Sequence, residues 1–296
     1  MNPGAPARAP GASTPQQGPI ALLCAGGALP FAVAESMRAA GREFVLVAID
    51  GIADRGLARF GAHFLSLGQL GKLFALLGRE RCSGVVLIGA MNRPTLRSMR
   101  IDLVGWSYLF DFLRNVRRGD DGMLRGMMRW FEDRGFPVLG AAEVAPELLA
   151  PEGTLGKFGA PAETVAAAAR GFSCLDALSP YDVGQALVTF GERIVAIEGA
   201  EGTDALIDRV AELRRAGRLP RAGRAGLLIK AAKLGQSLKV DLPVIGPRTV
   251  ERVAAVGLAG IVVEAGRVLL LDAQALGAAA DAAGIFLFGV KRNRPQ

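Results

Sequence analysis

The sequence is poor in the residues that build metal centres and nucleophile relays. It contains a single histidine, His63, within the segment HFLSL, which has the pattern of a short strand. One histidine excludes the paired-histidine HExxH zinc motif and histidine-rich metal centres, and it allows a Ser-His-Asp relay only if His63 itself takes part. We therefore expect His63 to be an ordinary strand residue.

Cysteine is also scarce. The three cysteines, Cys24, Cys82 and Cys174, lie far apart and form no CxxC pair, so no cysteine metal site or disulfide framework is predicted. Cys24 and Cys82 each border an apolar run, which is typical of small core residues in a reducing compartment.

Aromatic residues are few beside the basic ones. Two Trp and two Tyr accompany 35 Lys and Arg, and the formal net charge is +7. This charge favours anionic partners such as phosphorylated small molecules or acidic lipid surfaces. A nucleic-acid site would interleave aromatics with the basic residues, so no nucleic-acid partner is expected.

Long apolar runs are missing too. No uninterrupted run reaches the about 18 residues of a membrane-spanning helix. Residues 1–18 are rich in Pro, Gly and Ala, lack the apolar centre of a signal peptide, and predict a disordered tail. Hydrophobic residues still make up 51% of the 296 residues, which is ample for the cores of two compact domains.

Residues 19–158 predict a Rossmann-like N-terminal domain. Short apolar runs alternate with helical patterns there, and continuous apolar strands between helices are typical of a mostly parallel sheet covered on both faces. The expected strands are IALLCAG, FVLVAI, FLSLG, GVVLIGA and FPVLGA. An amphipathic helix is expected in GDDGMLRGMMRWFEDRGF, residues 119–136.

Residues 159–296 predict a C-terminal α/β domain with a mixed sheet and hairpins. A Gly- and Pro-rich stretch followed by an Ala-rich helix, over residues 151–170, suggests the domain boundary. Hairpins are expected at residues 186–198, with Gly191 opening a two-residue turn, and at residues 260–272. Each is followed by a helix and then a strand.

A glycine turn follows the first strand. Gly26 and Gly27 precede a helix that starts near Pro30, so backbone N–H groups could approach a phosphate there. Asp50 closes the next strand, about where a dinucleotide fold places its ribose-binding acid, which keeps a nicotinamide cofactor open as an alternative. A simple strand-to-helix turn would explain the glycines equally well.

Further charged residues lie at the expected strand ends and helix starts. Arg93 follows a buried strand, where open α/β sheets bind ligands, and could grip phosphate oxygens or pair with a carboxylate. Asp120 and Asp121 could hold a hard cation or cap a helix. The loop with Glu198, Glu201, Thr203 and Asp204 offers oxygen ligands for Mg²⁺, unless Thr203 simply caps the helix.

The segment KLGQSLKVDLPVIG joins a strand to a helix. Lys230 and Lys233 leave the strand, and Asp241 stands directly before Leu242 and Pro243. Two lysines beside one acid suit phosphate-ester chemistry, because the cations neutralise the phosphate while the acid orients water or holds a metal. The alternative is a salt-bridged loop acid.

Together these stretches resemble a known family, the two-domain UDP-2,3-diacylglucosamine pyrophosphatases (LpxI) of lipid A biosynthesis in Gram-negative bacteria. The resemblance runs from Ile20 to Val290. It rests on GGALP, GAMNRP, GDDGMLR, EGTDALIDR and the order Lys230, Lys233, Gln236 and VDLPVIG. It implies Mg²⁺-dependent hydrolysis of the substrate pyrophosphate to UMP and 2,3-diacylglucosamine 1-phosphate, with the lipid bound between the domains.

The resemblance also implies roles for individual residues. Asp241, Lys230 and Lys233 are expected to be catalytic. Substrate-binding residues are expected to be Gly26, Gly27, Leu29, Arg93, Gln185, Thr203 and Gln236. The metal is expected to bind at Asp120, Asp121, Asp204 and Asp241.

The partners follow from the same resemblance. We expect a lipid nucleotide substrate, a homodimer, and a cytoplasmic enzyme in peripheral contact with the inner membrane. Two alternatives stay open from the residues alone: an NAD(P)-dependent oxidoreductase that uses the glycine turn and Asp50, and a non-catalytic module that senses nucleotides or lipids.

Overall fold

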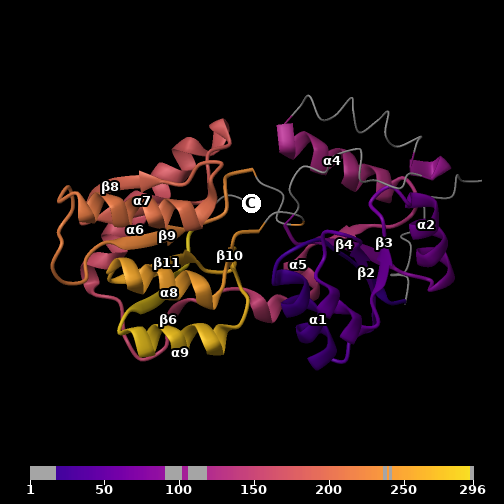
Figure 1. The fold of residues 1–296 in the computed structure, drawn as a ribbon, viewed down its shortest axis with the longest axis horizontal. Helices are drawn as coiled ribbons and strands as arrows, with labels where there is room; N and C mark the ends of the chain where they lie inside the picture. Colours follow the sequence, from indigo (N-terminus) through magenta and orange to yellow (C-terminus); the bar gives the residue numbers. More distant parts are fainter. Residues whose placement is uncertain (1–17, 91–101, 106–118, 236–238, 240–241, 294–296) are drawn as a thin grey trace, which may run out of the picture.

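The chain forms two α/β domains that lie side by side, with the short strand β10 between them (Figure 1). The computed structural model describes residues 18–90, 102–105, 119–235, 239 and 242–293, with residues 119–125 described through their backbone only. The expected tail over residues 1–18 lies almost wholly outside this range.

The N-terminal domain has one parallel sheet with the strand order β3-β2-β1-β4-β5. Its strands are β1 (Ile20–Cys24), β2 (Phe44–Ile49), β3 (His63–Leu65), β4 (Gly84–Ile88) and β5 (Val138–Leu139). The strand order reverses between β1 and β4, the point at which open α/β sheets bind ligands at their carboxyl edge. The predicted parallel sheet is confirmed.

Helices cover both faces of this sheet. They are α1 (Leu29–Ala39), α2 (Leu70–Arg79), α4 (Gly119–Glu132) and α5 (Ala141–Val144), with short 3₁₀ turns at Arg55–Phe60 and Pro146–Leu148. Alternate residues of β1 enter opposite cores: Leu22 packs toward α1 and α5, whereas Ala21 packs toward α2 and α4. This two-sided burial explains why the strands are apolar throughout.

The scarce residues behave as expected. Cys24 and Cys82 are buried free thiols, and burial raises the pKa of Cys24 to about 12, which leaves it protonated and unreactive. His63 begins the edge strand β3 and pairs with Val47. The predictions that Cys24 and Cys82 are core residues and that His63 lies in a strand are confirmed, whereas Cys174 is only partly buried.

The C-terminal domain has a six-stranded mixed sheet in the order β6-β13-β11-β9-β7-β8. Its strands are β6 (Gly153–Leu155), β7 (Ala186–Phe190), β8 (Arg193–Ile197), β9 (Leu227–Lys230), β11 (Gly260–Glu264) and β13 (Phe286–Val290). The chain thus enters this sheet at β6, a few residues ahead of the boundary predicted at residue 158. The predicted hairpin β7–β8 is confirmed, with Gly191 at φ 57° in its turn.

The second predicted hairpin, at residues 260–272, is wrong. After β11 the chain forms β12 (Leu269–Leu270), which pairs parallel with β10 (Val244–Ile245) in a separate two-stranded sheet. The reason is that β11 is a central strand: β9 occupies one of its edges and β13 the other, so no backbone groups remain to pair with β12.

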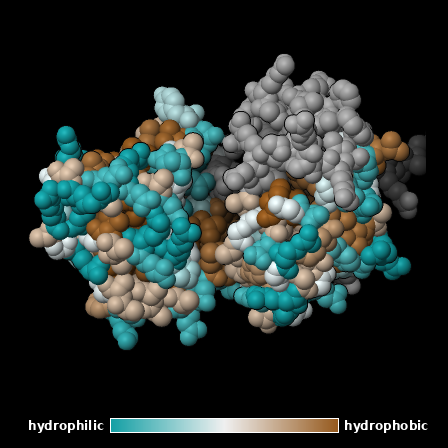
Figure 2. Space-filling view, in the orientation of Figure 1, coloured by the Kyte–Doolittle hydropathy of each residue, from teal (hydrophilic) through white to brown (hydrophobic). Residues whose placement is uncertain are grey.

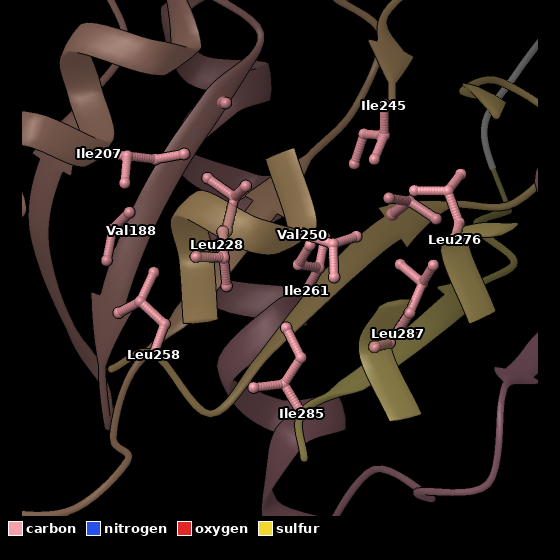
Figure 3. Packing of buried hydrophobic residues seen from close by; sticks show 14 of the residues in the cluster. Val188, Ile207, Leu228, Ile245, Val250, Leu258, Ile261, Leu276, Ile285 and Leu287 are labelled. Atoms are coloured by element: carbon pink, nitrogen blue, oxygen red, sulfur yellow. The ribbon is translucent and has the colours of Figure 1, made fainter. Parts of the chain in front are cut away.

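Among the described residues, the largest hydrophobic cluster lies in this domain. One face of the sheet contributes Val188, Leu228, Ile261 and Leu287, which meet side chains from the covering helices (Figure 3). Those helices are α7 (Gly202–Arg215), α8 (Pro247–Val256) and α9 (Ala273–Ala283), while α6 (Ala162–Leu178) covers the other face. Each fully buried aliphatic side chain stabilises the domain by about 1.5–3 kcal/mol relative to exposure.

The two domains meet at the two-stranded sheet of β10 and β12. Leu149 forms a bridge with Leu269, and the N–H of Ala150 donates to the carbonyl of Val268 at 2.8 Å. Leu242, which directly follows Asp241 in sequence, and Val244 pack against the N-terminal core together with buried Leu269. The β10 segment therefore anchors the C-terminal domain on its neighbour.

Candidate active site

Polar side chains gather at one edge of the C-terminal sheet. Lys230 is the last residue of β9 and Glu264 the last of β11, and because these strands are parallel they end at the same edge. The antiparallel hairpin brings two more residues there, since Ala186 pairs with Lys230 and Leu187 with Ile197. Gln185 and Glu198, which flank the hairpin, therefore share this carboxyl edge.

A chain of hydrogen bonds connects three of the predicted site residues. The ammonium of Lys230 donates to the hydroxyl of Thr203 at 2.8 Å, and that hydroxyl donates to Glu198 Oε1 at 2.5 Å. The second carboxylate oxygen accepts the backbone N–H of Gln185 at 2.7 Å. Lys230 and Glu198 are both only 8% exposed, so the network joins a buried cation to a buried anion through Thr203.

Glu198 was expected as a possible Mg²⁺ ligand, and its contacts give it a structural role. Both of its carboxylate oxygens accept hydrogen bonds from the protein, which fixes Thr203 and through it Lys230. Gly184 makes room for it: a Cβ at this position would lie 2.6 Å from the Cβ of Glu198. A larger residue at position 184 would push the carboxylate away from Thr203.

Thr203 does not cap α7, contrary to the simplest alternative for its sequence. The helix begins at Gly202 after the N-cap residue Glu201, and no side chain caps it. Thr203 instead uses its hydroxyl to bridge Lys230 and Glu198. This contact explains a threonine at the position better than capping does.

Lys233 lies three residues beyond Lys230. Its ammonium pairs with Asp182 Oδ1 at 2.5 Å, and its side chain is 17% exposed. Asp182 itself has φ 54°, in the left-handed region that residues other than Gly, Asn and Asp seldom adopt. Two lysines that neutralise anions are thus held at the same sheet edge, one against Thr203 and one against Asp182.

Asp204 contacts two arginines. Arg248 lies 3.2 Å from one carboxylate oxygen and Arg252 lies 3.5 Å from the other. These cations already balance its charge, so Asp204 fits a metal site less well than the sequence pattern suggested. Its assignment as a ligand stays a prediction.

The N-terminal domain presents the predicted glycine turn at its own carboxyl edge. The N–H of Gly26 donates to the carbonyl of Ala90 at 2.9 Å, and the N–H of Ala90 returns a bond to Gly26 at 2.8 Å. This bridge ties the loops after β1 and β4 together at the point where the strand order reverses. Gly27 has φ 91°, and apart from its chain neighbours no atom of the described residues lies within 4 Å of where its Cβ would stand, so its backbone is open toward them.

The helix that follows this turn is suited to an anion. Leu29 begins α1, Pro30 occupies its first turn, and the first turn contains no acidic residue and no side-chain cap. The N–H groups at such a helix start carry a partial positive charge. Leu29 itself is half-buried against the N-terminal core.

Asp50 pairs with an arginine, whereas a dinucleotide-binding fold would use this acid to bind a ribose. Its carboxylate pairs with Arg55 at 2.6 Å, and Arg55 in turn lies over the Phe64 ring at 4.6 Å from its centroid. The ion pair is exposed. This pairing explains Asp50 without a ribose.

Several predicted site residues lie outside the described residues: Arg93, Gln236 and Asp241, and the side chains of Asp120 and Asp121. Among the described residues, no group of three or more His, Cys, Asp or Glu side chains could hold a metal ion. Within the same ranges, none of the helices combines the length and the apolar character that a membrane crossing would need.

Glu264 was not expected as a site residue from the sequence. This carboxylate is 1% exposed, and burial raises its pKa, although the guanidinium groups of Arg292 and Arg267 and the N–H of Ala232 act in the opposite direction. The only signal in the sequence was one acid at the end of the apolar run GIVVE. A strand that ends in a buried acid at a sheet edge is a candidate for a functional site.

Comparison with known proteins gives consistent matches. The family model described as the LpxI N-terminal domain matches residues 19–148, and that of the LpxI C-terminal domain matches residues 151–288. The curated relative named UDP-2,3-diacylglucosamine pyrophosphatase LpxI, from Caulobacter vibrioides, is 39% identical over 277 residues. The alignment covers 93% of this chain and 99% of the relative.

Proposed function

The chain belongs to the LpxI family and is accordingly a pyrophosphate hydrolase, and we propose that its substrate is UDP-2,3-diacylglucosamine in lipid A biosynthesis. Water attacks one phosphorus of the pyrophosphate, the bridging P–O bond breaks, and UMP and 2,3-diacylglucosamine 1-phosphate leave. The single structural observation that carries this proposal is the buried Lys230–Thr203–Glu198 network at the carboxyl edge of the C-terminal sheet. Family membership favours the hydrolase over an oxidoreductase or a sensing module.

Lys230 and Lys233 neutralise the negative charge that builds on the pyrophosphate oxygens. Lys230 is suited to this because Thr203 and Glu198 fix its ammonium before the substrate arrives, so no reorganisation is needed in the transition state. Arg93 is proposed to neutralise further charge through its guanidinium group, which can donate two parallel hydrogen bonds to phosphate oxygens. Lys233 exchanges its contact with Asp182 for one with the substrate.

Asp241 is proposed to orient the attacking water and to accept its proton. Support comes from the residues that follow it, since Leu242 and Val244 pack against the N-terminal core. This anchors the end of the Asp241 segment at the junction of the domains, on the side of the molecule where a substrate could meet both.

Mg²⁺ is proposed as the cofactor. Asp241, with Asp120, Asp121 and Asp204 as further ligands, would hold it, and carboxylates are the donors that this hard cation prefers. Mg²⁺ commonly takes only one or two carboxylates and completes its shell with water and substrate phosphates. When bound it would supply further neutralisation of pyrophosphate charge.

The substrate is proposed to lie between the two domains. The phosphates face the glycine turn of Gly26 and Gly27, where the backbone of Gly27 is open, and the start of α1 at Leu29. Gln185, Thr203 and Gln236 complete the binding set. Hydrophobic residues come to the surface in the waist between the two lobes, which suits acyl chains (Figure 2). We further propose a cytoplasmic homodimer in peripheral contact with the inner membrane.

The test is release of UMP. The protein is incubated with UDP-2,3-diacylglucosamine and Mg²⁺, and separately with UDP-N-acetylglucosamine, which lacks the acyl chains. UMP from the lipid nucleotide alone is expected, and addition of EDTA should stop it. No UMP from the lipid nucleotide would refute the proposal, and a fluorescence titration that showed tight NADH binding would favour the oxidoreductase instead.

A further inference from the structure

The outer side of α6 differs from that of α7, a helix on the opposite face of the same sheet. The exposed residues of α7 all carry charge: Asp208, Arg209, Glu212 and Arg215. The exposed residues of α6 are mostly small or apolar: Ala162, Glu163, Val165, Ala166, Ala169, Arg170, Ser173 and Ala177. A covering helix normally turns a charged side to water, so α6 has the surface of a helix that is covered from outside as well.

The large hydrophobic side chains that this domain exposes also gather at α6. Val165 lies in the first turns of the helix and is 51% exposed, and Phe158 precedes the helix and is 46% exposed. Tyr181 follows the helix and is 77% exposed. Leu234 lies at this same end, because its N–H donates to the hydroxyl of Ser179 at 3.0 Å, and it is 45% exposed. Apolar surface exposed in this way marks a site of interaction.

A single helix is narrow for the sheet face that α6 covers. The six strands span about 24 Å, whereas a helix with its side chains is about 10–12 Å wide. α7, α8 and α9 share the opposite face, but among the described residues α6 is the helix that packs on this one. Apolar residues of the strands beside α6 are accordingly only half-buried: Ile194, Ile197, Phe288 and Val290. This face has room for a further covering element.

The charges on α6 favour a second copy of the chain as that element. Glu163 and Arg170 are about two helical turns apart, so they lie on the same side of α6. In an antiparallel pair of α6 helices with a two-fold axis near Ala166, Glu163 of each copy faces Arg170 of the other, whereas a parallel pair would bring like charges together. Arg170 contacts Glu192 of its own chain at 3.0 Å, but both side chains are exposed and such a pair contributes little.

We propose that the outer side of α6 is the homodimer interface, in which two copies of the helix pack antiparallel across a two-fold axis near Ala166. The alanines let the two helix backbones approach closely, and the exposed Val165 and Phe158 gain apolar contacts from the partner copy. The inference rests on the homodimer of the proposed function, for which it names the surface. Because Leu234 directly follows Lys233, this interface borders the candidate active site.

The first experiment measures the mass of the full chain in solution by sedimentation over a range of protein concentrations. The wild type is expected to form a dimer. Ala166→Arg places a cation near the axis, where it meets the same cation of the second copy, so the Kd of the dimer should rise at least about a hundredfold. Ala166 is exposed on the single chain, so the variant should fold, and circular dichroism with thermal unfolding checks this.

The matched control is Ala278→Arg. Ala278 is also an exposed alanine within a helix, but it lies on α9 at the opposite face of the sheet. This variant should dimerise with a Kd within about threefold of the wild-type value. A wild type that stays a monomer would overturn the inference, even if it sediments with phosphatidylglycerol vesicles. An Ala166→Arg protein that dimerises as tightly as the wild type would also overturn it, because the copies would then meet through another surface.

The second experiment exchanges the two charges. Glu163→Arg and Arg170→Glu each bring like charges together across the axis and should raise the Kd about tenfold. The double variant restores opposite charges, so its Kd should return to within about threefold of the wild-type value, and no such recovery would overturn the inference. UMP release is measured separately. A wild-type dimer that releases no UMP would refute the proposed hydrolase and leave the interface standing, whereas an active monomer would refute the interface alone.

Discussion

The two domains end their sheets in different ways. At the point where its strand order reverses, the N-terminal sheet ends in backbone: a glycine turn, a bridge between two loops, and a helix start without an acidic residue. The C-terminal sheet ends in charged side chains, among them the buried Lys230, Glu198 and Glu264. Backbone N–H groups can bind the oxygens of a substrate phosphate, whereas fixed cations stabilise the negative charge that develops during the reaction. We infer that the first edge binds the substrate and the second carries out the reaction.

The largest effect is expected from Lys230. Lys230→Met keeps the length and apolar stem of the side chain but removes the buried cation, so kcat should fall about 100- to 1000-fold, the scale of losing one preorganised donor. UMP release measures it. Lys72→Met, at an exposed position of the N-terminal domain, is the control and should leave kcat unchanged. Full activity of Lys230→Met would indicate that the reaction takes place at the carboxyl edge of the N-terminal sheet instead.

Arginines in the second domain should affect stability rather than activity. Arg214 is 7% exposed and donates to the carbonyls of Gly257 at 2.6 Å and Gly223 at 2.8 Å, and Arg224 donates to Ala283 at 2.6 Å. Arg214→Met should lower the free energy of unfolding by about 2–4 kcal/mol, because two carbonyls lose the charged donor that the buried guanidinium provides. Denaturant titration measures this loss. A large fall in kcat of the folded variant would contradict the separation of roles.

The glycine turn should affect binding rather than turnover. Gly27→Ala places a methyl group on the open side of the turn and strains a backbone with φ 91°. We expect KM to rise about tenfold, with a stability loss of about 1 kcal/mol. Gly41→Ala is the matched control, because Gly41 also has positive φ and open space around it. An equal change of KM in both variants would contradict a role of the glycine turn in substrate binding.

The smallest effect is a pH dependence of stability. Burial raises the pKa of Glu264 above its ordinary value, so the folded state holds this proton more tightly than the unfolded state. The contribution to stability is therefore present below the ordinary pKa of 4.5 and is lost as the pH rises through the higher folded value.

Glu264→Gln should remove this dependence. Thermal unfolding of both proteins is measured between about pH 4 and pH 8. The stability of the variant relative to the wild type should increase as the pH rises. A constant difference across that range would mean that Glu264 titrates normally in the folded chain.

The sequence predicted the parts of the fold that depend on local pattern. Apolar runs between amphipathic helices gave the parallel N-terminal sheet, and Gly191 marked the β7–β8 turn. The hairpin expected at residues 260–272 failed because pairing depends on which strand edges are free, and the position of β11 in the middle of the sheet is set by β9 and β13. Local pattern does not contain that information.

The candidate site shows the same limit. Lys230, Thr203 and Gln185 were each expected as site residues, and tertiary structure joins them through Glu198. Glu264 is a candidate only because the fold buries it at this edge beside Arg267 and Arg292. The positive net charge suggested anionic partners, yet Arg214, Arg221 and Arg224 donate to carbonyls near the ends of α7, α8 and α9. Such partners become visible only in three dimensions.

The most direct test of the central claim compares substrate binding and turnover in Asp241→Ala. We propose that this acid acts in the reaction and that the glycine turn acts in binding. The variant should therefore bind UDP-2,3-diacylglucosamine with near-normal affinity while its single-turnover rate falls at least about a hundredfold. A variant that hydrolyses the lipid nucleotide at close to the wild-type rate would contradict the account.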